Sequence, residues 1–509
     1  MSPAADPAAP PPAARPADGD PAAHPPAASP GRRWSWTRGP LLVLVFAVVA
    51  IAVHAPSLSN RSLNSDEAYA ATQAQVLNRG GRLYTDTVDR KPPVVPYLYA
   101  ATFRLTGSDN LLGVRILALI ADVLTALLLA GEARRRFGRD HAGLIAGLLF
   151  LASSAAFYAT DFQTANFEVF MLPLMVAGFV LAVRHRPLAA GLALGVATLT
   201  KQTAAMTLLP AAWLAWQATP ALRDRARRLA LLGAGFAAPI VAAALAFGVH
   251  DFVTWVFTGN GGYLSLGGAT GYVIHLGLRQ TLWFALANVA LVGLAVAAFR
   301  HRRADIDLWL WVASAVLAVA TGLRFFGHYY LQLLPPLALL ATRPLLHASR
   351  RALAAVAVVI AVPVGFFVHQ ALSSHRSRTE LVTQDLVAYV RRTVAPNQRI
   401  LVWGHLPEVY WQSGRAPATR FATTEFLTGQ SGGRPPNLDG MQDAAPGAWA
   451  DFEHDLRAHP PALVLDLAPA NIRNARYESL ARFPRFGDYL RRHDRVVAII
   501  DNVVAYAPR

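Results

Sequence analysis

Residues 111–130, LLGVRILALIADVLTALLLA, decide the class of this protein. A helix needs about 20 predominantly apolar residues to cross the hydrocarbon core of a bilayer. Comparable apolar runs, some of them shorter, recur along the chain at 40–56, 143–158, 167–183, 188–200, 203–219, 229–248, 279–299, 307–322, 329–345 and 351–370. We therefore expect an α-helical polytopic membrane protein with about eleven transmembrane helices.

The composition supports the same class. Of the 509 residues, 54% are hydrophobic and only 15% are charged, whereas soluble domains carry about 25% charged residues. This composition argues against an ordinary cytosolic enzyme and against a disordered scaffold. The chain has no cysteine, which also excludes disulfides, thiolate metal sites and a cysteine nucleophile.

The basic residues follow the apolar runs. The net charge is +16, but residues 371–509 hold 17 basic and 14 acidic residues, so most of the excess lies elsewhere. Alternate loops between the apolar runs are rich in arginine, namely 134–139, 184–186, 223–228, 300–303 and 343–351. Positive loops stay in the cytoplasm, so we expect a multi-pass plasma-membrane protein with a cytoplasmic N-terminus and an extracytoplasmic C-terminus. The charge then reports orientation, and no nucleic-acid partner is predicted.

The chain divides into three predicted regions. Residues 1–38 form a disordered Pro/Ala-rich cytoplasmic tail, 39–370 a transmembrane domain, and 371–509 a small extracytoplasmic α/β domain. Within the last region, strand-like runs alternate with helical ones; the strands are expected at 399–403, 462–467, 496–500 and 503–506, and the helices at 379–394 and 447–459. Residues 96–106, PYLYAATFRLT, are too short to span and predict a helix in the outer interface.

Two adjacent acids, Asp66 and Glu67, follow the first apolar run. A helix starts here, with Ser65 as the expected N-cap, and acids in a first turn are stabilised by the helix dipole. The acids are therefore either a helix cap or a functional pair. A carboxylate close to the membrane surface can act as a general base toward a hydroxyl within its reach.

The segment DRKPP places Arg90 and Lys91 before two prolines, which fix the backbone. A rigidly held lysine just above the bilayer suits a lipid phosphate, because its ammonium is a compact point charge. The alternative is a charged turn that leads into the interfacial helix.

Three further candidate sites fall on the same predicted side. Asp161 lies in a short outer loop without a basic residue, and either binds a metal or a sugar hydroxyl or is a solvated acid. The segment RFFGHYY brings Arg324, His328 and Tyr329 together, either for phosphate binding or as an interfacial aromatic belt. Lys201 interrupts apolar sequence and needs a charged partner or ligand.

The predicted outer-face location of these sites limits the kind of activated substrate that they can use. An outer-face site has no access to ATP or nucleotide sugars, so its activated substrate would be a lipid phosphate. No Walker loop, zinc-binding helix or Ser-His-Asp set is found in the sequence.

Three segments of the sequence resemble a known family. One apolar run is followed by DEAYAATQAQVLNRGGRLYTDTVDRKPPVVPYLYAATFRLTG and then by the run at 111–130. This order, together with GVATLTKQTAAMTLLPAAWL and RFFGHYYLQLLPPLALLA, resembles the GT-C membrane glycosyltransferases of the glycosyltransferase family 39, protein O-mannosyltransferase and aminoarabinose transferase group. The resemblance covers about residues 40–345.

The resemblance implies an inverting hexosyl- or pentosyltransferase that moves a sugar from a polyprenyl-phosphate donor to an acceptor hydroxyl on the outer face. It implies that Asp66 is the catalytic carboxylate with Glu67 as its neighbour, and that Lys91 faces the donor phosphate. The other residues that the resemblance assigns to the site are Asp161, Arg324 and His328. No cofactor is required; a divalent metal, if one is used, would lie at Asp66 and Asp161.

The acceptor stays open between a glycan, a lipid and a protein, and membrane lipids surround the helices. The isoprenoid is expected in a groove beside residues 96–106. Two other functions remain: a lipid or glycan transporter or flippase, for which no internal repeat is evident, and a non-catalytic membrane scaffold.

Overall fold

The computed structural model describes residues 38–59, 63–107, 110–260, 268–373, 377–430, 432–435 and 444–509. The tail predicted over 1–38 lies outside these ranges, apart from Arg38. The chain divides into two compact units, Met1–Leu42 and Val43–Arg509. Residues 38–42, the start of the first helix, belong to the first unit, and every other described residue belongs to the second.

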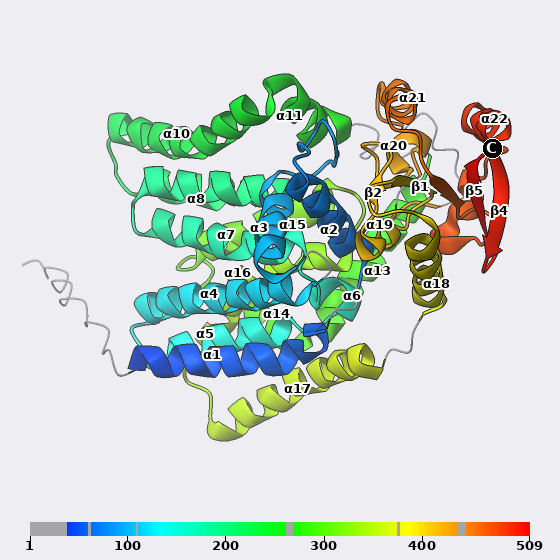
Figure 1. The fold of residues 1–509 in the computed structure, drawn as a ribbon. Coiled ribbons are helices and arrows are strands. Elements are labelled where there is room, and N and C mark those ends of the chain that lie inside the picture. The colour runs from blue at the N-terminus through cyan, green and yellow to red at the C-terminus, as the bar shows by residue number, and fades with distance from the viewer. Residues whose placement is uncertain are drawn as a thin grey trace, which may run out of the picture. The chain divides into compact units, whose positions relative to one another are not determined.

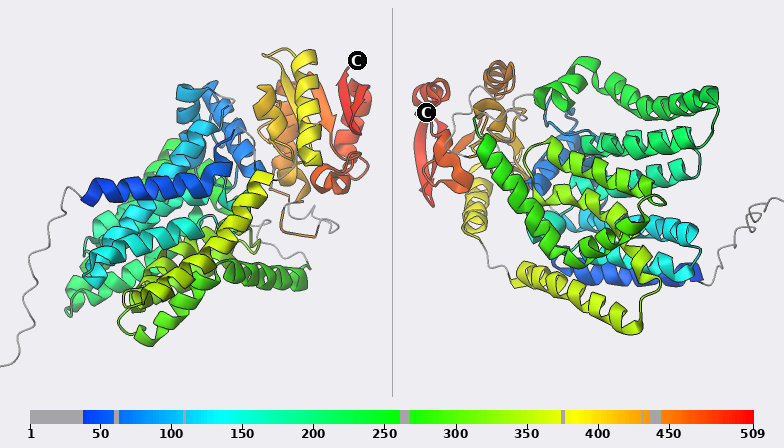
Figure 2. Two further views of the ribbon diagram at one scale, coloured as in Figure 1. Left: turned by 90° about the horizontal axis from the view of Figure 1, so that it is seen from below. Right: turned by 180° about the vertical axis from the view of Figure 1, so that it is seen from behind.

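Each apolar run forms one helix or a pair of helices. They are α1 (Arg38–His54), α4 (Leu112–Phe137), α5 (Asp140–Ser153), α7 (Phe167–Val183), α8 (Pro187–Thr200), η2 (Gln202–Thr207) with α9 (Leu208–Gln217), α10 (Leu222–Phe247), α13 (Thr270–Ala287) with α14 (Val289–Ala297), α15 (Ile306–Thr321), η5 (Gly327–Leu333) with α16 (Leu334–Leu345), and α17 (Arg350–Ser373). Figure 1 and Figure 2 show α4, α5, α7, α8 and α10 running side by side.

The number of membrane crossings stays a prediction. Among the described residues, four helical stretches are long and apolar enough to cross: Gly39–Ser57, Leu112–Phe137, Leu222–Phe247 and the one that contains α17 (Arg350–Ser373). The bent pair of α13 and α14 would be a fifth if it formed one span. Four other apolar helices have only 10–17 residues each. The helices are therefore where the sequence predicts them, while the count of eleven spans is not established by their lengths.

The run 279–299, expected as one helix, is broken. Helices α13 and α14 meet at 87° around Asn288. The Asn288 side chain is buried, and its amide donates a hydrogen bond to the carbonyl of Ala156, 3.2 Å away. Because a buried amide needs partners, this contact stabilises the break.

Small residues bring α8 and α10 together. A Cβ added at Gly191 would collide with the backbone carbonyl of Leu232, and one at Gly235 with that of Leu188. Small residues let membrane helices approach at backbone distance, as the Gly- and Ala-rich sequence of α8 predicts.

Short helices cover the end of the bundle that holds the predicted outer loops. They are η1 (Ala55–Ser57), α2 (Ser65–Asn78), α3 (Val94–Thr106), α6 (Ala159–Phe162), α11 (Val249–Val256) and η3 (Thr258–Asn260). The short helix η4 (Ala298–His301) belongs instead to the arginine-rich loop 300–303. Helix α2 is capped by Asn64 and not by Ser65, because the Asn64 Oδ1 accepts the backbone N–H groups of Asp66 (3.0 Å) and Glu67 (3.2 Å). The predicted interfacial helix is α3; its location in a membrane interface stays a prediction.

The C-terminal region forms an α/β fold. Its strands are β1 (Arg399–Trp403), β2 (Ala416–Pro417), β3 (Leu463–Asp466), β4 (Asp494–Ile500) and β5 (Val503–Pro508), and the described residues form one five-stranded sheet in the order β2-β1-β3-β5-β4. Its helices are α18 (Arg378–Thr393), α19 (Glu408–Ser413), α20 (Glu425–Thr428), α21 (Ala448–Ala458), η7 (Ile472–Glu478) and α22 (Pro484–His493).

The strand sequences explain the topology of the sheet. The uninterrupted apolar run of β3 is buried along its length, as suits a central strand covered on both faces. It lies parallel to β1, with Val464 opposite Leu401, and antiparallel to β5. Asp501 and Asn502 both have positive φ, which is the requirement of a two-residue hairpin turn between β4 and β5.

Helix α2 joins the sheet region to the helical bundle. Thr72, Gln75 and Arg79 each donate a side-chain hydrogen bond to a backbone carbonyl of the segment 407–414. These residues recur at helical spacing, so one face of α2 carries all three contacts.

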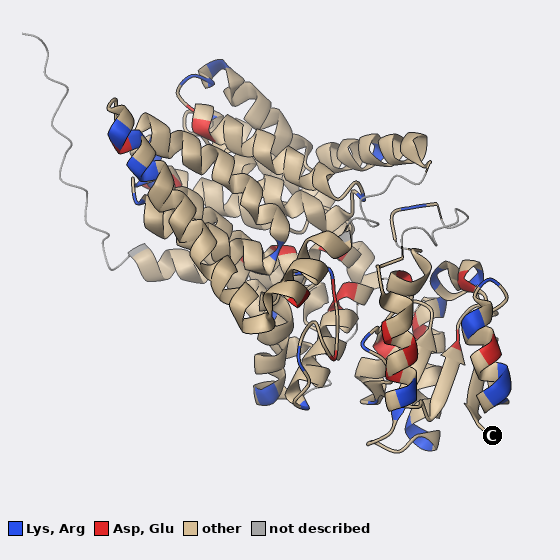
Figure 3. Cartoon of the chain, turned by 90° about the horizontal axis from the view of Figure 1, so that it is seen from above, with Lys and Arg blue, Asp and Glu red and all other residues tan. Residues whose placement is uncertain are grey.

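The arginine-rich loops gather at the end of the helices remote from the sheet (Figure 3). Arg136 pairs with Asp305 and Asp307, and Arg343 pairs with Asp305 at 2.6 Å. The loops thus share one end of the bundle, as the charge pattern predicts; which side of a membrane this end faces stays a prediction.

Candidate active site

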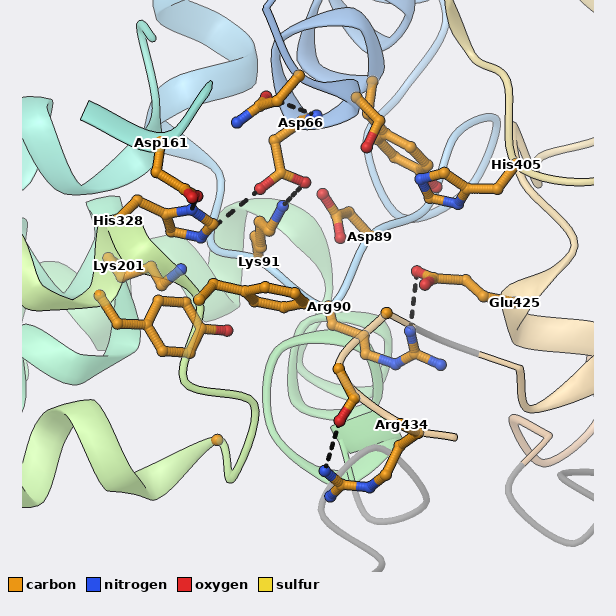
Figure 4. A pocket seen from close by; sticks show the side chains of 18 of the residues that line it. Asp66, Asp89, Arg90, Lys91, Asp161, Lys201, His328, His405, Glu425 and Arg434 are labelled. Atoms are coloured by element: carbon orange, nitrogen blue, oxygen red, sulfur yellow. Dashed lines mark hydrogen bonds and ion pairs between the residues drawn. The ribbon is translucent and has the colours of Figure 1, made fainter. Parts of the chain in front are cut away.

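A cavity of about 840 Å³ lies between the start of α2, the segment 89–91, η5 and the C-terminal sheet region. Of the predicted site residues, it is lined by Asp66, Arg90, Lys91, Asp161, Lys201, His328 and Tyr329. Residues separated by more than 260 positions in sequence therefore face one space (Figure 4).

Lys91 contacts Asp66 directly. Its Nζ lies 3.0 Å from the Asp66 Oδ1 and 4.6 Å from the centre of the Phe167 ring. The backbone of this segment is held in place, because the Tyr84 hydroxyl donates to the Lys91 carbonyl (2.9 Å) and the Gln202 amide to that of Arg90 (2.6 Å). The side chains of Lys91 and Asp66 keep 22% and 31% of their surface exposed, so a ligand can reach both.

The surrounding cations keep Asp66 ionised. Burial alone would raise its pKa, but Lys91, and then His328 and Lys201, outweigh burial and hold the pKa of Asp66 well below its usual range. In the same way, burial opposes the charge of Lys91, yet Asp66 and Asp89 raise the pKa of Lys91 above its usual value. The resting site is a stable ion pair.

His328 bridges two carboxylates. Its Nδ1 lies 2.6 Å from the Asp161 Oδ1, and its Nε2 lies 3.9 Å from the Asp66 Oδ2. Burial would lower the pKa of His328, but Glu168 and Asp161 raise it, which favours the imidazolium. Gly327 makes room for this contact, because a Cβ there would lie 2.6 Å from the Asp161 Oδ2.

Lys201 is paired, as its isolated place in apolar sequence predicts. Its Nζ lies 2.7 Å from the Glu168 Oε1 and 4.7 Å from the centre of the Tyr329 ring. Glu168 is only 1% exposed and does not line the cavity, so Lys201 is the member of the pair that faces the site.

Arg90 reaches the C-terminal region. Its Nη1 lies 2.9 Å from the Glu425 Oε1, and its guanidinium lies over the Phe426 ring. Arg324 is different: it is buried, it does not line the cavity, and its Nη1 donates to the Gly432 carbonyl (3.2 Å).

Glu67 does not line the cavity either. Its carboxylate accepts Arg115 Nε (3.2 Å) and Nη2 (2.9 Å), and also the backbone N–H groups of Ala165 (2.9 Å) and Leu63 (3.1 Å). Both side chains of the pair are almost completely buried. The adjacent acids of the sequence thus point in different directions.

The sequence interpretation missed the wall that the C-terminal region contributes. His405, Glu425 and Glu478 line the cavity there, as do Arg434 and Arg473. No local pattern marks these residues, because they come from separate loops and short helices of an α/β fold. Asp89, which precedes Arg90 and Lys91 in the sequence, also lines the cavity.

The structure offers no dedicated metal cluster. Among the described residues, no group of three or more His, Cys, Asp or Glu could hold a metal ion. Asp66 and Asp161, the ligands expected if a metal is used, contact Lys91 and His328 in this structure.

Comparisons with known proteins identify the fold. Residues 90–247, less than half of the chain, match the family described as dolichyl-phosphate-mannose-protein mannosyltransferase. No curated protein matches the chain by sequence.

The chain is similar to the crystal structure of ArnT from Cupriavidus metallidurans bound to undecaprenyl phosphate, with a TM-score of 0.62, 15% identity, and coverage of 92% of this chain and 98% of ArnT. The apo state of the same protein has a TM-score of 0.61 at the same identity and coverage. The archaeal oligosaccharyltransferase AglB from Archaeoglobus fulgidus, in complex with an inhibitory peptide and a dolichol-phosphate, has a TM-score of 0.49 and 12% identity, with coverage of 89% of this chain and 73% of AglB. The predicted resemblance to the GT-C glycosyltransferases is confirmed, and the chain has the fold of ArnT.

Proposed function

We propose that this chain is an integral membrane glycosyltransferase that moves a sugar from a polyprenyl-phosphate donor to an acceptor hydroxyl. The observation that carries this proposal is the contact of Lys91 with Asp66 inside one large cavity. A cation for a phosphate leaving group and a carboxylate for a hydroxyl proton are the two groups that such a transfer needs. The similarity to ArnT, whose structure holds undecaprenyl phosphate, supports a donor of this kind.

The donor phosphate is proposed to bind at Lys91. Lys201 and His328 carry further positive charge nearby, and both act on Asp66 electrostatically. Because each of these cations already has an acidic partner, the phosphate shares them with those acids. Arg324 does not line the cavity, so we assign it to support of the segment at Gly432.

Asp66 is proposed as the general base. The acceptor oxygen attacks the anomeric carbon, the bond from that carbon to the phosphate oxygen breaks, and its electron pair leaves with the phosphate. The acceptor proton passes to Asp66, and this single displacement inverts the anomeric carbon. Once Lys91 also contacts the phosphate, its electrostatic stabilisation of the Asp66 carboxylate weakens. The pKa of Asp66 then rises toward the range in which a carboxylate accepts protons.

Two predicted catalytic acids receive supporting roles. Asp161 orients the imidazole of His328, since it lies 2.6 Å from Nδ1 and leaves Nε2 facing Asp66. Glu67 anchors the first turn of α2 to α4 through Arg115 and so fixes the place of Asp66.

The isoprenoid is proposed to lie along the apolar wall of the cavity. Val256, Phe257, Tyr272 and Phe326 line this wall. No residue of α3 (Val94–Thr106) lines this cavity, so we propose a path near α11, α13 and η5 in place of a groove beside 96–106.

The remaining assignments stay proposals on the sequence evidence. They are a multi-pass plasma-membrane location, a cytoplasmic N-terminus, an extracytoplasmic C-terminal region, and a glycan, lipid or protein acceptor. No step above uses a cofactor or metal.

The test compares full-length wild type with Asp66→Asn in proteoliposomes. Each is incubated with polyprenyl-phosphate sugars and a cell-envelope extract, and sugar transfer is measured. We expect transfer by wild type and a loss of at least about 100-fold in Asp66→Asn, in line with the 10²–10⁴-fold contribution of a general base. Asp86→Asn is the control, because Asp86 is an exposed acid of the same outer loop that does not line the cavity.

Normal transfer by a folded Asp66→Asn protein would refute the assignment of the base. Movement of the intact lipid across the bilayer without sugar transfer would identify the chain as a transporter instead.

A further inference from the structure

Asp89 is a buried acid that the proposed chemistry does not use. It is only 6% exposed and lines the cavity. Its two basic neighbours in the sequence form ion pairs with other acids: Arg90 with Glu425 at 2.9 Å, and Lys91 with Asp66 at 3.0 Å. Within the described part of the chain, no ion pair joins Asp89 to a cation. The Asp89 carboxylate has a backbone hydrogen bond with Arg90 and is influenced by the charge of Lys91. Because it also lines the cavity, it can accept a further hydrogen bond from a ligand there.

Asp89 lies between two groups of residues (Figure 4). Asp66, Lys91, His328 and Asp161 lie on one side, and His405 and Glu425 of the C-terminal region lie on the other. The cavity is continuous across both groups. A molecule bound on the C-terminal side would therefore reach Asp66 from the side opposite to Lys201.

The C-terminal wall can both donate and accept hydrogen bonds. Glu478 accepts the hydroxyls of Thr424 and Thr428, each at 2.7 Å, and burial raises the pKa of Glu478 to about 7. Burial also lowers the pKa of His405, which favours its neutral form. Burial raises the pKa of Asp89 to about 6. Carboxyl and imidazole groups of this kind offer both donors and acceptors.

Two cations at this wall have acidic partners. Arg90 pairs with Glu425, and Arg473 makes a two-pronged contact with Glu408 at 2.7 and 3.0 Å. Arg434 instead donates to the carbonyls of Leu323 and Gly433, on the η5 side of the cavity. An anionic molecule would meet the acids of the wall without a compensating charge, and an apolar one would leave them unsatisfied.

We propose that the space bounded by Asp89, His405, Glu425 and Glu478 is the acceptor subsite, and that it takes the uncharged, hydroxyl-rich end of a glycan. Asp89 accepts a hydrogen bond from the acceptor sugar and positions its attacking hydroxyl toward Asp66. This inference rests on the proposed transfer reaction and specifies its second substrate.

The test separates acceptor binding from donor binding. Full-length wild type, Asp89→Ala, Asp89→Asn and Glu478→Gln are placed in proteoliposomes with a polyprenyl-phosphate sugar, and transfer is measured against the concentration of a cell-envelope extract. Binding of polyprenyl phosphate is measured separately by fluorescence. We expect Asp89→Ala to raise the KM for the acceptor about 10-fold or more, as the loss of a hydrogen bond to a charged group does, with donor affinity unchanged within two-fold. Asp89→Asn restores part of this loss, and Glu478→Gln raises the same KM.

Asp86→Ala and Glu453→Gln are the matched controls, because both acids lie away from the cavity. Mass spectrometry of the product is expected to place the new sugar on the hydroxyl of an uncharged sugar. An unchanged acceptor KM in Asp89→Ala and Glu478→Gln would overturn the subsite. A product modified on a phosphate-bearing sugar, a uronic acid or a protein side chain would overturn the acceptor class. Absence of transfer by wild type with bound donor would instead remove the transfer reaction itself.

Discussion

Replacement of Glu67 by Gln tests whether this acid is structural or chemical. Glu67 and Arg115 have side chains that are 0% and 1% exposed, and the carboxylate accepts hydrogen bonds from two Arg115 nitrogens and two backbone N–H groups. In Glu67→Gln, the amide NH₂ replaces one acceptor oxygen and faces the N–H donors that this oxygen had accepted. The Arg115 charge is then buried without its counterion.

Removal of one partner of a buried pair costs about 3–5 kcal/mol. We therefore expect the Tm of Glu67→Gln in detergent micelles, followed by tryptophan fluorescence, to fall clearly below that of wild type. The double variant Glu67→Leu/Arg115→Leu is expected to recover much of this loss, because apolar residues replace a buried ion pair at little cost. Transfer per folded molecule is expected to stay within about 10-fold of wild type, below the 10²–10⁴-fold effect of removing a general base. A Glu67→Gln protein as stable as wild type but inactive would show that Glu67 acts in the chemistry.

Three further predictions concern Lys91, Asp89 and Gly191. Lys91→Ala should weaken binding of polyprenyl phosphate by about 10-fold or more, because it removes a charge-assisted contact, while Lys91→Arg should retain part of the affinity. If Lys91→Ala and wild type bound polyprenyl phosphate equally well in an equilibrium assay, Lys91 would have no phosphate role. The pKa of Asp89 is raised from 3.8 to about 6, so its ionisation lowers the stability of the folded state as pH rises from about 4 to about 6. Asp89→Asn should therefore be more stable than wild type at pH 7 by up to about 3 kcal/mol, with the difference vanishing near pH 4. An equal difference in stability at both pH values would contradict this reasoning. Gly191→Ala should lower the Tm because its Cβ meets the Leu232 carbonyl, whereas Gly233→Ala, which meets no atom within 4 Å, should not; equal Tm values would refute the close packing of α8 and α10.

The sequence predicted the helices well because long apolar runs have one stable solution in a bilayer. The break at Asn288 was not predicted, since the contact that stabilises it is with Ala156, in the distant turn between α5 and α6. The strands at 399–403 and 463–466 followed from their uninterrupted apolar runs, while the two-residue strand β2 was too short to carry a pattern.

The candidate site was predictable in part. Asp66, Lys91, Asp161, Lys201 and His328 line one cavity, as the shared side of the predicted topology suggests. Glu67 shows the limit of this reasoning, because adjacent helical residues lie about 100° apart and only one of the pair faces the cavity. His405 and Glu478 could not be anticipated, because tertiary folding of the C-terminal region brings them to the site.

The most direct test of the central claim is a structure of the full-length protein with a polyprenyl-phosphate sugar analogue bound. The account predicts the phosphate within about 3 Å of the Lys91 Nζ, the isoprenoid along Phe257 and Tyr272, and the anomeric carbon facing Asp66. A lipid phosphate bound away from Lys91, for example among the arginine-rich loops at the opposite end of the helices, would contradict it.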